Sequence, residues 1–267
     1  MSFLIGLGSN TVANVLFWAL LGALFWVVST VVARRFSQFF GLNRTARVAV
    51  YLSNLWKPES SPSGRSEGYT ISLHELRAAQ SVDKLFGSAP FRLPDLVRGL
   101  VDAIWLRHQV QCVTDVCPLR AEDADLGRNL IIVGSSARNS VRARYVRAGL
   151  PSVILTREDG DPLSAIQSAS ITVLSEGGGN EITLDNWNFA ILEKCYDPER
   201  GITLIFCLGP RADGSWAATE YLVRNWRRLA REFSGNDFAI CLCFPYTDKY
   251  LEEYVEPSRR LSLKGGR

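Results

Sequence analysis

The sequence predicts a single membrane-spanning helix followed by a mostly parallel α/β sandwich, on two observations. Residues 1–33 contain no Asp, Glu, Lys or Arg, so all 57 charged side chains (30 basic and 27 acidic) lie in residues 34–267. From residue 47 onward, continuous Val/Ile/Leu runs alternate with helical segments, as in a sheet covered by helices on both faces. We therefore expect a transmembrane helix at 1–35, a juxtamembrane linker at 36–46, the α/β domain at 47–248 and a basic polar tail at 249–267.

Composition excludes several classes of protein and of site. The 267-residue chain is 47% hydrophobic and 21% charged, which is too apolar for a disordered chain and too polar for a multi-span transporter. Its net charge of +3 falls short of the basic excess of a nucleic-acid-binding protein, so we expect no nucleic-acid partner. The six cysteines and two histidines show no zinc-site spacing. We expect free, buried thiols, no metal and no cofactor.

The first element is the apolar helix. Val12–Ala33 reads VANVLFWALLGALFWVVSTVVA and supplies the ~20 residues that cross ~30 Å of hydrocarbon. A cleaved signal peptide would carry basic residues before a shorter apolar core, whereas here Arg34 and Arg35 follow the run and no charge precedes it. With Arg44 and Arg47 also on that side, the positive-inside bias predicts a single pass through the inner (plasma) membrane, with the N-terminus outside and the domain in the cytoplasm.

Small residues on this helix indicate self-association. Ala19 and Ala23 are four residues apart, as are Asn10 and Asn14 nearer the outer end. Small side chains allow close helix packing, and amides can bond across helices. We expect membrane lipid and further copies of the chain as partners, although such short patterns also occur by chance.

The first half of the domain begins with a buried strand at 47–53 (RVAVYLS) and a Pro/Ser/Gly-rich loop at 54–68. Ser72–Glu75 forms a capping-box pattern that predicts the start of a helix. Pro94 opens a second predicted helix. Residues 110–127 have no clear assignment.

The second half begins with the clearest strand, Asn129–Gly134 (NLIIVG), followed by an arginine-rich helix that ends at Gly149. A short strand at 152–156 and weaker candidates at 171–174 and 188–192 come next. Gly177–Gly179 between them is either a flap or a hairpin turn. A strand at 202–208, an amphipathic helix over 217–229 and a strand at 237–244 complete the domain, and the tail is predicted to be loosely ordered. The arginine-rich helix has a basic face made of Arg138, Arg142, Arg144 and Arg147. We expect this face to be solvated; contact with anionic lipid and a ligand-facing stripe are the alternatives.

Polar, glycine-containing loops follow three of the predicted strands. Ligands of open parallel sheets bind outside the carboxyl ends of the strands. Two of these loops also lead into helices, whose first N–H groups and positive dipole end favour a bound anion. Serine hydroxyls and forked arginine cations complete the groups that suit a phosphate. The candidate ligand-binding residues are Ser53, Asn54, Gly134, Ser135, Ser136, Arg138, Asn139, Gly209, Arg211, Asp213, Gly214 and Ser215.

Other interpretations of these loops stay open. Gly, Ser and Asn are also ordinary turn and cap residues, and the chain has neither a G-x-G-x-x-G fingerprint nor a Walker loop. No catalytic set is predicted. His74 and His108 are far in sequence from the strand-end loops and are expected to be structural or surface residues, while Asp213 or Glu176 would be the acid–base groups of an enzyme.

The loop sequences resemble a known group of domains. A strand followed by G-S-S-A-R-N-S, a glycine-rich segment, and an apolar strand followed by G-x-x-x-x-G-S-x-A-A at the start of a helix are similar to Rossmann-like sensor domains of the SLOG and TIR-like group. With the N-terminal helix, the layout resembles membrane effectors of bacterial antiphage signalling. The resemblance implies that a nucleotide second messenger binds the soluble domain and that the membrane helices assemble or open.

These expectations combine into one leading hypothesis. The chain is a membrane-anchored sensor–effector that binds a nucleotide-like ligand and changes the assembly of its helices to disrupt the membrane. The alternatives are a membrane-tethered nucleotide hydrolase or glycosidase-like enzyme, and a scaffold whose sheet binds another protein.

Overall fold

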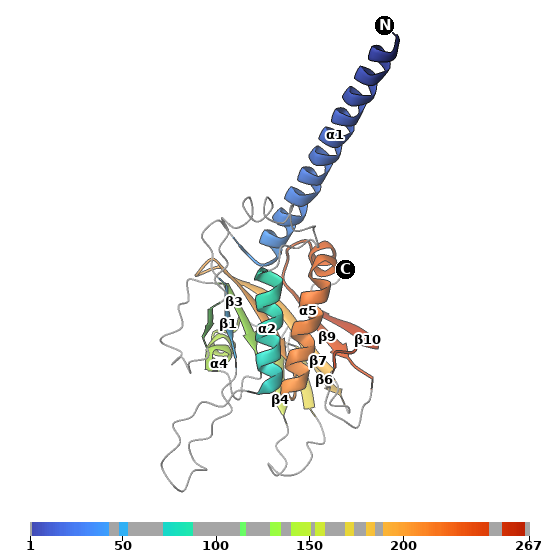
Figure 1. Cartoon of the computed structure of the whole chain (residues 1–267). Coiled ribbons are helices and arrows are strands. Elements are labelled where there is room, and N and C mark those ends of the chain that lie inside the picture. Colours follow the sequence, from blue (N-terminus) through green and yellow to red (C-terminus); the bar gives the residue numbers. More distant parts are fainter. Residues whose placement is uncertain are drawn as a thin grey trace, which may run out of the picture.

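A seven-stranded sheet lies at the centre of the computed structural model, and one long helix leads away from it (Figure 1). The structure describes residues 2–42, 48–52, 72–87, 113–115, 129–134, 140–150, 153–157, 169–173, 180–184, 189–245 and 253–264. The helices are α1 (Ser2–Phe39), α2 (Leu73–Gly87), α4 (Ser140–Arg147) and α5 (Ala212–Phe233). The strands are β1 (Val48–Tyr51), β2 (Val113–Asp115), β3 (Asn129–Val133), β4 (Val153–Arg157), β5 (Ala169–Val173), β6 (Asn180–Leu184), β7 (Phe189–Asp197), β8 (Ile202–Leu208), β9 (Phe238–Cys243) and β10 (Arg259–Lys264).

The central sheet is mixed, which corrects the prediction of a mostly parallel one. Its order is β10-β9-β7-β8-β3-β1-β2. The pairs from β2 to β8 are parallel, whereas β8–β7, β7–β9 and β9–β10 are antiparallel. A short turn with Gly201 at positive φ joins β7 to β8, and such a short connection joins only antiparallel strands. Glu193 and Lys194, both buried inside β7, obscure this strand in the hydrophobicity pattern. The fold is mixed α/β, and a Rossmann-like topology is not confirmed.

Two further segments differ from expectation. The predicted strands at 152–156 and 171–174 lie in a separate antiparallel sheet of order β4-β5-β6. Residues 259–264, expected in a loosely ordered tail, form the edge strand β10 beside β9. The predicted helix at Pro94 and the segment Gly177–Gly179 lie outside the described residues.

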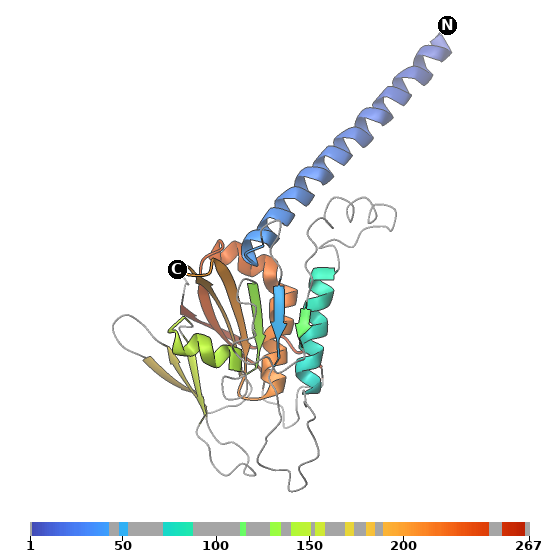
Figure 2. The ribbon, with the colours of Figure 1, turned by 90° about the vertical axis from the view of Figure 1, so that its left-hand side faces the viewer.

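Helices cover both faces of the central sheet, as the sequence predicts (Figure 2). On one face, residues such as Val50, Ile205 and Ile240 pack against α2 and α5. On the other face, Ile132 and Phe206 are among the side chains that pack with α4. Alternate residues of each strand therefore point into two separate apolar layers.

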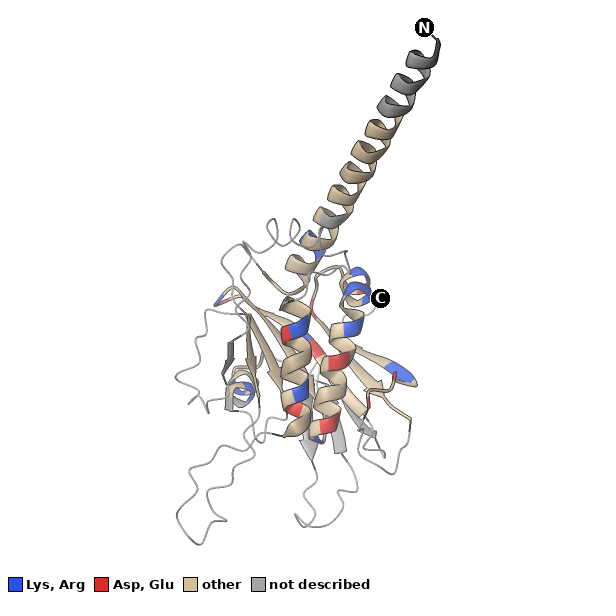
Figure 3. Cartoon of the chain, viewed as in Figure 1, with Lys and Arg blue, Asp and Glu red and all other residues tan. Residues whose placement is uncertain are grey.

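The long helix α1 is apolar and exposed over most of its length. Its segment Ala13–Phe39 contains an 18-residue window with a mean hydropathy of 2.3 and is, by length and composition, able to cross a membrane. The described part before Arg34 carries no charged side chain (Figure 3), and large side chains such as Leu16 and Trp18 are exposed. A helix that is apolar all round and has no protein around it matches a lipid environment.

The end of α1 is built into the domain. The helix continues to Phe39 through residues for which the sequence predicts a linker. The ring of Phe36 lies 4.9 Å from that of Trp226 on α5 and 5.3 Å from that of Phe86 on α2, and Phe40 lies 5.0 Å from Phe86. We call Phe36, Phe40, Phe86 and Trp226 the foot cluster. It fixes α1 to the last turn of α2 and to α5 about two turns before the end of that helix.

Polar contacts hold the chain just after α1. Leu42 N–H donates to the carbonyl of Ser37 at 2.7 Å and closes the helix, with Gly41 in the left-handed region. Asn129 Nδ2 then donates to the Gly41 carbonyl at 2.9 Å, and Asn129 Oδ1 accepts the Thr203 N–H at 2.7 Å. The end of α1 is thereby tied to the starting ends of β3 and β8.

Candidate functional site

The carboxyl ends of three parallel strands form the edge of the sheet opposite α1. Residues Val133 and Cys207 are paired near the ends of β3 and β8, and β1 lies next to β3 in the same direction. The Gly134 N–H continues the ladder by donating to the Cys207 carbonyl at 3.1 Å. Because Gly41 is held at the starting ends of the strands, roughly 23 Å of β8 separates α1 from this edge. We call it the carboxyl edge.

The structure describes half of the predicted ligand-binding residues. Those described are Gly134, Gly209, Arg211, Asp213, Gly214 and Ser215, and all of them lie at the carboxyl edge. The others, Ser53, Asn54, Ser135, Ser136, Arg138 and Asn139, lie outside the described residues.

Two glycines allow the tight turn between β8 and α5. A Cβ atom on Gly209 would lie 2.6 Å from the Cα and carbonyl carbon of Gly214, and 2.7 Å from the Ser215 nitrogen. A Cβ atom on Gly214 would lie 2.9 Å from the Phe189 carbonyl oxygen. The backbones therefore approach too closely for any side chain at Gly209.

The charged residues of this turn are paired with each other. Arg211 Nη2 lies 2.6 Å from Asp213 Oδ2, and Arg211 Nε donates to Asp213 Oδ1 at 3.2 Å. Asp213 is 3% exposed and also accepts the Gly214 N–H at 2.9 Å. A carboxylate in the first turn of α5 satisfies the helix dipole. Asp213 thus occupies both the guanidinium fork and the helix position that the sequence suggests for a phosphate, and Ser215 is buried.

His74, which is far from the loops in sequence, also lies near this turn in space. Ser72 Oγ accepts the His74 N–H at 3.2 Å at the start of α2. The imidazole lies 5.6 Å from the ring of Trp216 in the first turn of α5, and Arg77 lies 5.9 Å from that ring. The two helices start side by side, a tertiary relation that sequence spacing does not reveal.

The surroundings of His74 favour its neutral form. Its Nδ1 is buried and has no hydrogen-bond partner in the structure. Burial is the main cause that lowers the pKa of His74 from its ordinary value of 6.5. The charge of Asp213 opposes this shift, whereas those of Arg77 and Arg211 add to it.

We expect His74→Gln to make stability less sensitive to acid. Because the folded-state pKa of His74 lies below its unfolded value of about 6.5, the unfolded chain binds this proton first as the pH falls. The resulting loss in the free energy of unfolding is absent above about pH 6.5 and grows as the pH falls toward the folded pKa. Urea unfolding of the unsubstituted protein and of His74→Gln in detergent, from pH 7.5 to 5, measures this loss. Parallel pH profiles would contradict this prediction.

One arginine of α4 departs from the solvated face that the sequence predicts, whereas Arg147 is exposed as expected. Arg142 is fully buried against the sheet. Burial lowers its pKa from the ordinary 12.5 to about 10, and the charge of Glu193 on β7 opposes this shift. The charge of Glu193 thus offsets part of the cost of burying Arg142 between α4 and the sheet.

Comparisons with known proteins leave the function open. The chain matches no family model, no curated protein and no solved structure. Among the described residues, no group of three or more His, Cys, Asp or Glu side chains is arranged to hold a metal ion. The geometry of the carboxyl edge and its connection to α1 are therefore the basis for a functional proposal.

Proposed function

We propose that this protein is a membrane-anchored sensor–effector whose α/β domain binds a nucleotide-like anion at the carboxyl edge. Binding changes the assembly of the α1 helices of several copies and disrupts the membrane. In this proposal α1 crosses the inner membrane once, the N-terminus lies outside and the domain lies in the cytoplasm. The role in antiphage defence that the sequence resemblance implies belongs to the same proposal.

One observation carries the proposal: the two helices that start at the carboxyl edge end against α1. His74 and Trp216 mark their adjacent starts, Ser81 of α2 hydrogen-bonds Glu220 of α5 midway, and Phe86 and Trp226 belong to the foot cluster (Figures 1 and 2). The part of α5 from Ala212 to Trp226 corresponds to roughly 21 Å of helix. A change at the edge that shifts either helix therefore reaches the foot of α1 through packed side chains.

The Arg211–Asp213 pair supplies the chemistry for such a change. Two phosphate oxygens can replace the Asp213 carboxylate in the guanidinium fork, since carboxylates and phosphates both accept two parallel hydrogen bonds from arginine. The exchange would release Asp213 from Arg211 in the first turn of α5. A ligand that prefers the released arrangement shifts the protein toward it.

Binding can be tested with a panel of linear and cyclic mono- and dinucleotides. We expect at least one of them to raise the unfolding temperature of the full chain in detergent. With that nucleotide, Arg211→Gln should weaken affinity roughly tenfold, because a charge-assisted hydrogen bond is lost. Asp213→Asn should strengthen it, because the competing charge is removed. Calorimetric titration measures both effects.

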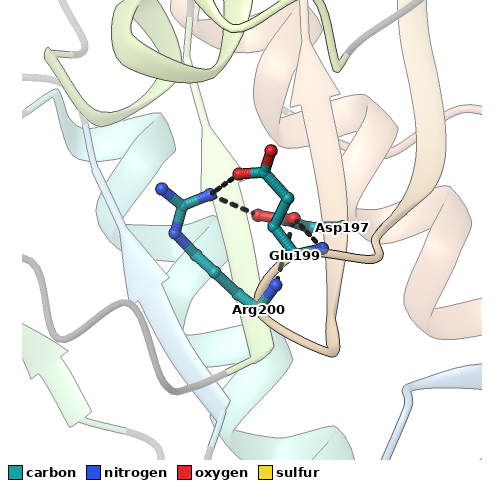
Figure 4. A network of polar contacts seen from close by, with 3 residues as sticks. All are labelled: Asp197, Glu199 and Arg200. Atoms are coloured by element: carbon teal, nitrogen blue, oxygen red, sulfur yellow. Dashed lines mark hydrogen bonds and ion pairs between the residues drawn. The ribbon is translucent and has the colours of Figure 1, made fainter.

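A matched pair at the opposite edge serves as the control. Arg200 Nη1 lies 2.8 Å from Asp197 Oδ2 in the β7–β8 turn (Figure 4). Arg200→Gln and Asp197→Asn should leave the nucleotide affinity unchanged. If no nucleotide raises the unfolding temperature, the proposal fails. Conversion of the nucleotide to a product, lost in Asp213→Asn, would favour the hydrolase alternative instead.

A further inference from the structure

Two cysteines lie on one face of β9, at the end that reaches the carboxyl edge. Cys241 and Cys243 are two residues apart in the strand, so their side chains point the same way. β9 is antiparallel to β7, which is antiparallel to β8, so β9 and β8 end at the same edge. Cys241 is buried, whereas Cys243, the last residue of the strand, is partly exposed. The partial exposure of Cys243 departs from the expectation that all the thiols are buried.

The neighbours of Cys243 are a thiol, a cation and an aromatic ring. The Cys241 thiol hydrogen-bonds the Cys243 sulfur. Arg259 on β10 lies directly opposite Cys243 on one side, and its charge acts on both sulfurs. Phe189 on β7 lies directly opposite on the other side. Ser258 Oγ donates to the Cys243 carbonyl at 3.1 Å and fixes the backbone where β10 begins.

This environment separates Cys243 from the other described cysteines. The Cys241 hydrogen bond is the main cause that lowers the pKa of Cys243 from the ordinary 9.0 to about 7; burial opposes the shift and the Arg259 charge adds to it. The same hydrogen bond, together with burial, raises the pKa of Cys241. Burial raises the pKa of Cys207 to about 12. At neutral pH a larger fraction of Cys243 than of Cys241 or Cys207 is therefore thiolate, the reactive form of the side chain.

We propose that Cys243 is an oxidation site at the carboxyl edge, and that Cys241 and Arg259 are its positioning residues. The Cys243 thiolate attacks one oxygen of a hydroperoxide, the O–O bond breaks, and a Cys243 sulfenic acid forms. The sulfur loses two electrons, and the peroxide is reduced to an alcohol, or to water when it is hydrogen peroxide, after its oxyanion takes a proton from solvent.

Strand geometry disfavours a disulfide between Cys243 and Cys241. Side chains two residues apart in an extended strand start about 6.7 Å from each other. A disulfide needs Cβ atoms roughly 3.8 Å apart. A disulfide between Cys241 and Cys243 would therefore require β9 to bend.

The test is peptide-resolved mass spectrometry of the full chain in detergent. After dilute hydrogen peroxide, a dimedone adduct should appear on Cys243 before any on Cys195, Cys207 or Cys241. Iodoacetamide labelling of Cys243 at a series of pH values should give a midpoint near the lowered pKa of its thiol, at about pH 7. Restoring a thiol with the ordinary pKa of 9.0 would lower the thiolate fraction at pH 7, and hence the labelling rate, roughly 50-fold.

Three variants separate positioning from general folding. Cys241→Ala and Arg259→Gln should each move the labelling midpoint of Cys243 upward, whereas Cys241→Ser keeps a donor and should restore much of the shift. Circular dichroism confirms that each variant is folded. A midpoint above pH 8.5 in the unsubstituted protein, a Cys241–Cys243 disulfide as the main product, or a midpoint that Cys241→Ala leaves in place would each overturn the proposal.

Discussion

Gly209→Ala is expected to lower the free energy of unfolding by roughly 3 kcal/mol, the upper range for overpacking a tight site. The new methyl group would lie 2.6 Å from backbone atoms of Gly214 and 2.7 Å from the Ser215 nitrogen. Backbone atoms at the start of a buried helix have no rotamer by which to move away, so the β8–α5 turn itself must open. Denaturant unfolding of the full chain in detergent measures the loss.

Gly22→Ala is the matched control, because a Cβ atom there has nothing within 4 Å. It should leave the unfolding of the α/β domain unchanged. If the Gly209→Ala variant were as stable as the unsubstituted protein, the β8–α5 turn would be looser than the structure indicates. The tight turn could then no longer be used to define a site at the carboxyl edge.

Trp226→Ala is expected to have the other large effect, a loss of about 3–5 kcal/mol, as for other large-to-small changes at buried aromatic residues. Trp226 is 5% exposed, and its ring contacts that of Phe36 at 4.9 Å. Its removal takes away the packing between α5 and the end of α1. We therefore also expect faster trypsin cleavage after Arg34 and Arg35, which are exposed just before the foot cluster.

Phe206→Ala provides the comparison for this second readout. Phe206 is fully buried in the apolar layer on the opposite face of the sheet, so its removal should destabilise the domain to a similar degree. It should accelerate cleavage after Arg34 and Arg35 less than Trp226→Ala does. Equal acceleration by both variants would mean that the foot cluster does not specifically hold α1.

Local patterns predicted the elements better than their pairing. The continuous apolar runs at 129–134, 202–208 and 237–244 and the amphipathic pattern at 217–229 correspond to β3, β8, β9 and α5. A covered strand and a one-sided helix both leave a periodic signal. The second half of β7 gave no such signal, because Glu193 and Lys194 are charged residues that only partners distant in sequence bury.

The candidate site shows the same division. The turn at 209–215 could be found from its glycines and its place after a strand. The Arg211–Asp213 pair, the approach of His74 to Trp216 and the Cys243–Arg259 neighbours could not. The last two depend on how α2 meets α5 and how β10 meets β9. The foot cluster was hidden for a similar reason, since Phe36 and Phe40 look like a linker until Phe86 and Trp226 pack on them.

Dye release from liposomes tests the central claim most directly. The full chain is reconstituted in dye-loaded vesicles, and the nucleotide that raises its unfolding temperature is added. We predict release from vesicles with the unsubstituted protein. With Trp226→Leu, which keeps an apolar side chain but breaks the aromatic contact to α1, we predict nucleotide binding without release. Release that Trp226→Leu leaves unchanged, or binding to the unsubstituted protein without any release, would contradict the account.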